Sequence, residues 1–176
     1  MMMKIFRVGV LLLGLVCMVS CGSEQEEELP VSREVEQQIQ SEFDELLVGT
    51  SKAADSQLER FKYSDGRNAD LAGKDLGFKT PCGQNDAGET LYHVSIQINN
   101  DTAKYSKAEY EAKVQAVRDY WKSKGLEPRN FDSGDNYVEV IATTDAGTIV
   151  KYSAGDNSEF VSADTRCIFS TSSSPS

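Results

Sequence analysis

The feature that most limits what this chain can become is its long apolar run, which occupies residues 8–19. Lys4 and Arg7 precede the run as a short cationic segment. A helix needs about 20 apolar residues to cross a bilayer core of about 30 Å, so this run is too short to span. Its length and its charged flank are those of a secretory signal. We therefore predict a signal segment at residues 1–20, followed by a folded part that is exported.

The end of the apolar run carries a specific motif, Met18-Val19-Ser20-Cys21. It resembles the lipobox of bacterial lipoproteins, which has an aliphatic residue at −3, a small residue at −1 and an obligatory cysteine. In that family the cysteine thiol receives a diacylglyceryl group, and signal peptidase II cuts before it. The resemblance implies that Cys21 is the lipidated first residue of the mature chain, anchored to the extracytoplasmic side of the cell membrane.

Two features of the sequence allow alternatives to this interpretation. The family usually has leucine where this chain has Met18, and an ordinary secretion signal followed by a chance cysteine stays open. Cys17 is a poorer lipidation site than Cys21, because Val16 before it is too bulky for the peptidase.

Residues 21–31 are rich in glutamate and have no apolar periodicity, so we expect an acidic flexible tether. Polybasic segments bind anionic lipids, and an acidic one does not. Attachment to the lipid bilayer must then come from acyl chains on Cys21, two or more of which give stable anchoring. The remaining boundaries predicted are a single domain at residues 32–169 and a disordered Ser-rich tail at residues 170–176.

The charge balance excludes one class of partner. The chain has 18 basic and 28 acidic residues, and losing Lys4 and Arg7 with the signal takes the net charge from −10 to −12. Binding to nucleic acid requires clustered lysine and arginine that displace counterions. We therefore expect no nucleic-acid partner.

Two cysteines, Cys82 and Cys167, remain after the signal segment and Cys21 are set aside. An even pair in an oxidising compartment indicates a disulfide. The alternative is a pair of buried free thiols.

Two segments have the spacing of amphipathic helices. The first runs from Ser32 to Leu47, with Gly49 and Thr50 expected to end or bend it and a second helical piece expected at residues 51–60. The other begins at the capping box Ser106–Glu109 and runs to about Lys124, where Gly125 fits the position after the helix and Leu126 its hydrophobic contact.

Alternation of apolar and polar residues predicts four strands. They are residues 91–98, 137–143, 148–153 and 160–169, with hairpin turns at residues 144–147 and 154–157. Residues 62–88 read as loops, with one short strand near residues 79–82. Helices and alternating strands in the order helix-β-α-β-β-β predict an α+β fold, a two-layer sandwich with helices on one face of a mainly antiparallel sheet.

Few residues suggest chemistry. His93 is the chain's single histidine, so triad, thiol and zinc chemistry lack partners and we predict no catalytic residues, metal or cofactor. Residues 132–136 have the composition of oxygen-rich calcium loops but lack the full EF-hand pattern, and a turn is the better interpretation. Tyr110 and Trp121 share a helical stripe that favours core packing, with Tyr120 at its margin.

Taken with the lipobox, the segment Tyr120–Leu126 and the late cysteine make the chain similar to small uncharacterised lipoproteins of Gram-positive bacteria, particularly actinobacteria. The resemblance implies location and a loose α+β shape, and no activity. We expect a non-enzymatic binding or accessory module that contacts an envelope component or protein. A hydrolase that uses carboxylates alone, and an inhibitor or immunity protein, are the alternatives.

Overall fold

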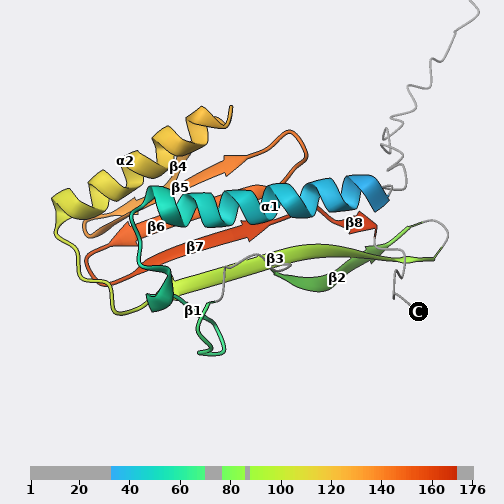
Figure 1. The fold of residues 1–176 in the computed structure, drawn as a ribbon, viewed down its shortest axis with the longest axis horizontal. Coiled ribbons are helices and arrows are strands. Elements are labelled where there is room, and N and C mark those ends of the chain that lie inside the picture. Colours follow the sequence, from blue (N-terminus) through green and yellow to red (C-terminus); the bar gives the residue numbers. More distant parts are fainter. Residues whose placement is uncertain (1–32, 70–76, 86–87, 170–176) are drawn as a thin grey trace, which may run out of the picture.

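Two helices cover one face of an antiparallel sheet in the computed structural model, which describes residues 33–69, 77–85 and 88–169 (Figure 1). This is the α+β two-layer sandwich that the sequence predicts. The predicted signal segment, Cys21, the tether and the Ser-rich tail lie outside the described residues. None of the described helices combines the length and the apolar character needed to cross a bilayer.

The sheet has eight strands in the order β1-β3-β7-β6-β5-β4, with β2 and β8 also paired to β3. The strands are β1 (Lys62–Tyr63), β2 (Phe78–Gln84), β3 (Thr90–Asn100), β4 (Arg129–Gly134), β5 (Tyr137–Thr143), β6 (Ile149–Gly155), β7 (Glu159–Asp164) and β8 (Ile168–Phe169). Helix α1 (Arg33–Ala53) packs over β7, and helix α2 (Lys107–Ser123) packs over β5 and β6.

Helix α1 (Arg33–Ala53) is longer than predicted, because Gly49 neither ends nor bends it. A Cβ atom at Gly49 would lie 1.9 Å from the hydroxyl oxygen of Tyr120 on α2. Glycine here is explained by the close approach of the two helices, which offsets the roughly 1 kcal/mol that glycine costs inside a helix. The second helical piece predicted at residues 51–60 is wrong. A single 3₁₀ turn, η1 (Leu58–Arg60), follows α1 instead.

Helix α2 (Lys107–Ser123) begins and ends as its sequence predicts. The capping box between Ser106 and Glu109 is formed. At the other end Gly125 has a φ of 81°, and the amide of Leu126 donates to the carbonyl of Trp121 at 3.0 Å. This is a Schellman stop, in which the residue after the glycine also contacts the core.

The strands predicted from alternation are present, and three departures have physical reasons. Strand β4 was missed because all six of its residues are exposed at the edge of the sheet, so no buried side chain marks it. Strand β1 is only two residues long. The predicted strand at residues 160–169 is divided into β7 and β8, because the hydroxyl of Thr165 accepts the backbone amide of Val94 at 2.8 Å and interrupts the ladder.

The predicted disulfide between Cys82 and Cys167 is present, with the Cα atoms 6.0 Å apart. Cys82 lies in β2 and Cys167 directly precedes β8. Both strands pair with β3 over the same residues, Leu91 and Tyr92, and must therefore lie on opposite edges of it. The bond thus ties together the two neighbours of β3.

Candidate functional site

Strands β6 and β7 carry polar side chains on both faces of the sheet. Successive side chains in a strand point to opposite faces. Tyr152 and Glu159 therefore point toward the helices, while Ser153 and Phe160 point to the other face, which none of the described helices covers. The two groups of residues define two candidate sites, back to back across one hairpin.

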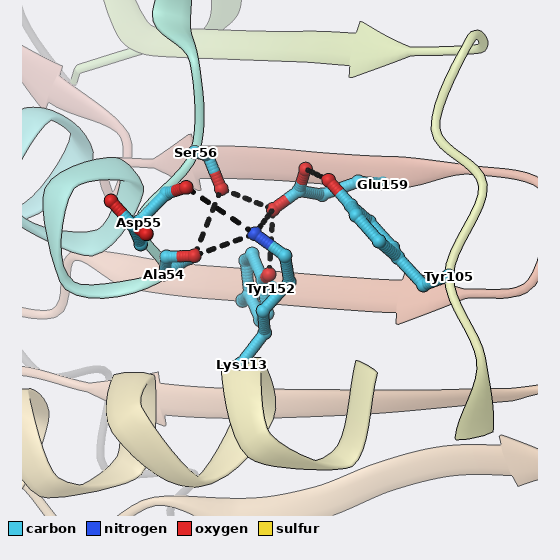
Figure 2. Close-up of polar contacts among 7 residues, drawn as sticks. All are labelled: Ala54, Asp55, Ser56, Tyr105, Lys113, Tyr152 and Glu159. Atoms are coloured by element: carbon cyan, nitrogen blue, oxygen red, sulfur yellow. Dashed lines mark hydrogen bonds and ion pairs between the residues drawn. The ribbon is translucent and has the colours of Figure 1, made fainter. Parts of the chain in front are cut away.

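On the helix face lies a buried polar group that we call the Glu159 cluster: Ser56, Tyr105, Lys113, Tyr152 and Glu159 (Figure 2). The side chain of Glu159 is fully buried. The hydroxyl of Tyr152 donates to its Oε1 at 2.7 Å, and the hydroxyl of Tyr105 donates to Oε2 at 2.8 Å. Ser56 donates a further hydrogen bond to Oε1.

The cluster also contains a cation. The Nζ of Lys113 on α2 lies 3.9 Å from Oε1 of Glu159 and donates to the backbone carbonyl of Ala54 at 2.7 Å. The same ammonium stands 4.7 Å from the ring centroid of Tyr105. A buried charge is tolerated when it is paired and hydrogen bonded, and both conditions hold here.

The protonation of the two phenols decides what the cluster can do. Burial raises the pKa of Tyr105 and of Tyr152 well above the ordinary value of 10.0, and the adjacent carboxylate of Glu159 raises both further. Each phenol is therefore a fixed donor at neutral pH. With the carboxylate enclosed and its partners in place, the cluster holds α1, α2 and the β6–β7 hairpin together and offers no substrate access to Glu159.

On the opposite face a hollow of about 400 Å³ opens at the turns that join β4 to β5 and β6 to β7. We call it the β5–β7 hollow; it is lined by Asn136, Tyr137, Glu139, Ser153, Gly155, Asp156, Asn157, Ser158 and Phe160. It exists because β6 supplies small residues there. A Cβ atom at Gly155 would lie 2.6 Å from the carbonyl oxygen of Asn136 and 2.8 Å from Cβ of Tyr137, so only glycine fits.

Three residues form a row across the floor of the hollow. Ser153 lies directly opposite Glu139 on β5 and Phe160 on β7. Residues in such positions have Cβ atoms about 4.5–5.5 Å apart. Ser153 is only 7 % exposed, and neither its hydroxyl nor the half-buried carboxylate of Glu139 has a hydrogen bond to any other residue in the described part of the chain.

Electrostatics distinguish the acids beside the hollow. Burial raises the pKa of Glu139, and the positive charge of Lys151 partly offsets this. The hydroxyl of Tyr137 donates to Oδ2 of Asp132 at 2.5 Å, and this bond lowers the pKa of Asp132. The Nζ of Lys151 stands 4.9 Å from the ring centroid of Phe131 on β4. No ion pair joins Lys151 to Glu139 among the described residues.

The residues singled out from the sequence have ordinary places. His93 is half-buried in β3 opposite Thr80. Asp132 belongs to β4, so the segment predicted as a turn is half strand. Tyr110 and Trp121 are buried in the core as predicted, and Tyr120 packs at its margin. No three His, Cys, Asp or Glu side chains in the described residues are grouped as metal ligands would be.

Sequence reasoning missed both sites. For the Glu159 cluster a signal existed, because Glu159 shares the alternation of Val161 and Ala163 and so falls on the apolar face. A glutamate on such a face requires buried partners. No comparable signal marks the hollow, since Ser153 and Gly155 read as routine strand and turn residues.

Comparisons with known proteins give little further guidance. No protein-family model matches the chain, and no curated protein matches it significantly. The chain is similar in fold to the crystal structure of a DUF4853 family protein from Actinomyces odontolyticus, at 11 % identity and a TM-score of 0.47, over 82 % of this chain and 72 % of that one. A similarity of this size supports no statement about activity.

Proposed function

We propose that the chain is a lipid-anchored extracytoplasmic protein whose domain acts as a non-enzymatic binding module, with the β5–β7 hollow as its binding site. The proposed anchor rests on the cationic segment, the short apolar run and the lipobox-like motif that ends in Cys21. The disulfide between Cys82 and Cys167 is consistent with export, because such bonds persist in oxidising compartments.

The observation that carries the binding role is the composition of the hollow. Binding sites combine apolar or aromatic walls with a few polar groups that fix a ligand's orientation. Here the rings of Tyr137 and Phe160 accompany Ser153 and Glu139, two polar groups without a hydrogen-bond partner in the described residues. The volume of the hollow, about 400 Å³, is that of a site for a small ligand.

Anchoring is tested by labelling cells with a fatty acid and separating membranes. The parent chain should carry the label and sediment with membranes, whereas Cys21→Ser should do neither. A Cys21→Ser chain that is still labelled and membrane-bound would refute the lipidation site.

The binding role is tested by crosslinking in intact cells followed by pull-down. Ser158→Trp places bulk at the exposed rim of the hollow, and Ser123→Trp places the same bulk at the exposed end of α2 as a control. We expect Ser158→Trp alone to lose the crosslinked species. Equal crosslinking by both variants would count against the hollow as the binding site.

A hydrolase that uses carboxylates is the second candidate, and one observation favours it. Asp132 lies directly opposite Glu139 across β4 and β5, and the pKa values of the two are shifted in opposite directions. Such divergence is the mark of an acid and base pair. If this candidate is right, the full chain should cleave cell-wall glycan, and Glu139→Gln should lower the rate about 10²–10⁴-fold. Absence of turnover above the blank would exclude it.

A further inference from the structure

The β5–β7 hollow has a chemical bias that narrows its ligand. Among its nine lining residues are two carboxylates, Glu139 and Asp156, and no lysine or arginine. The only lysine hydrogen bonded to a lining residue in the described part of the chain is Lys104, whose Nζ is held by Oδ1 of Asn157 at 2.6 Å on the rim. The two carboxylates would repel an anionic ligand and attract a cation. The charge of Lys151 acts on Glu139 and weakens this bias, but Lys151 stands over the ring of Phe131 and is not among the lining residues.

The unpartnered groups on the floor of the hollow indicate which kind of cation it would bind. An ionised carboxylate only accepts hydrogen bonds, and a hydroxyl can accept as well as donate. Glu139 and Ser153 face each other across β5 and β6, so one donor group placed between them can reach both. A quaternary ammonium has no N–H to donate, whereas a primary ammonium has three.

The aromatic walls of the hollow also suit a primary ammonium. Phe160 completes the row next to Ser153, and Tyr137 stands on the other side of Glu139 along β5. An ammonium within about 6 Å of an aromatic ring is attracted to its face, and the methylene groups behind it gain apolar contact. The hydrogen bond from Tyr137 to Asp132 fixes that phenol in place.

From these observations we propose that the hollow binds a protonated primary amine, with Glu139 and Ser153 accepting its hydrogen bonds. The inference rests on the proposed binding function and names the ligand class. Two sources share this chemistry: a free alkylamine, and the lysine side chain of a peptide.

The test uses the isotope-labelled full-length chain in detergent micelles, with backbone amide shifts recorded at constant ionic strength. n-Butylammonium chloride should produce saturable shifts at Ser153, Gly155 and Phe160. 1-Butanol, which has the same alkyl chain without the charge, should bind at least tenfold more weakly. Nα-acetyl-lysine methylamide separates the sources: tighter binding than n-butylammonium indicates a peptide-borne lysine, and equal or weaker binding indicates a free amine.

Variants complete the design. Glu139→Gln should weaken n-butylammonium binding at least tenfold and Ser153→Ala should weaken it severalfold, while Glu111→Gln, an exposed acid on α2, should leave it unchanged. Absence of saturable shifts, equal binding of 1-butanol, or unchanged binding by Glu139→Gln would overturn the amine proposal. If the cellular crosslink that depends on the hollow persists in that case, the binding function stands and only the ligand class is wrong.

Discussion

Removing one hydroxyl from the Glu159 cluster tests whether this cluster holds the two layers together. Tyr152→Phe keeps the buried ring but deletes the donor that lies 2.7 Å from Oε1 of Glu159. Hydrogen bonds to charged groups contribute about 1.5–3 kcal/mol, and this acceptor has no access to water that could replace the lost donor. We therefore expect the free energy of unfolding to fall by about 1.5–3 kcal/mol.

A matched control is present in the same core. The hydroxyl of Tyr110 donates to a neutral carbonyl, that of Asp135, at the longer distance of 3.4 Å. Tyr110→Phe should therefore cost less than about 1 kcal/mol. Urea unfolding followed by the fluorescence of Trp121, the chain's single tryptophan, measures both. Equal losses in the two variants, or a Tyr152→Phe variant as stable as the parent, would refute the role assigned to the cluster.

Three further variants probe other parts of the fold. Breaking the disulfide with Cys167→Ser should lower stability by up to about 4–5 kcal/mol, because the bond closes a loop with a sequence separation of 85; urea midpoints under non-reducing conditions check this. Gly49→Ala should lower the free energy of unfolding by about 1–3 kcal/mol, because the added methyl group overpacks against Tyr120. Adding Tyr120→Ala should recover most of this loss in the double variant, and thermal unfolding measures both. Tyr137→Phe should remove the stability that comes from the lowered pKa of Asp132. This stability is present above the ordinary pKa of 3.8 and is lost as the pH falls through the lower folded value, so the stabilities of variant and parent should converge in acid. A constant difference between them down to pH about 2 would contradict the assignment.

The elements that the sequence predicts well are those whose burial is periodic. The stripe of Tyr110, Val114, Val117 and Trp121 is buried, and the caps at both ends of α2 form because capping depends on a few adjacent residues. Strand β5 also spans the predicted residues, although its burial does not alternate, since Val140, Ile141 and Ala142 are all buried.

The elements that the sequence predicts poorly depend on partners distant in the chain. Strand β4 is exposed throughout and is defined by its pairing to β5, which no local pattern reveals. Gly49 was read as a helix stop because its packing partner, Tyr120, is 71 residues away. Glu159 needs donors from the segment after α1, from α2, from β6 and from the loop before α2, and its role becomes visible only when these converge.

The disulfide has a consequence for how the domain responds to proteolysis. Proteases attack exposed peptide bonds, and the chain between Cys82 and Cys167 contains β3, α2 and most of the sheet. A nick at any bond in that span leaves two fragments that stay covalently joined, with β3 still flanked by both of its tied neighbours. A domain cut once in this region would therefore migrate as an intact chain until the disulfide is reduced.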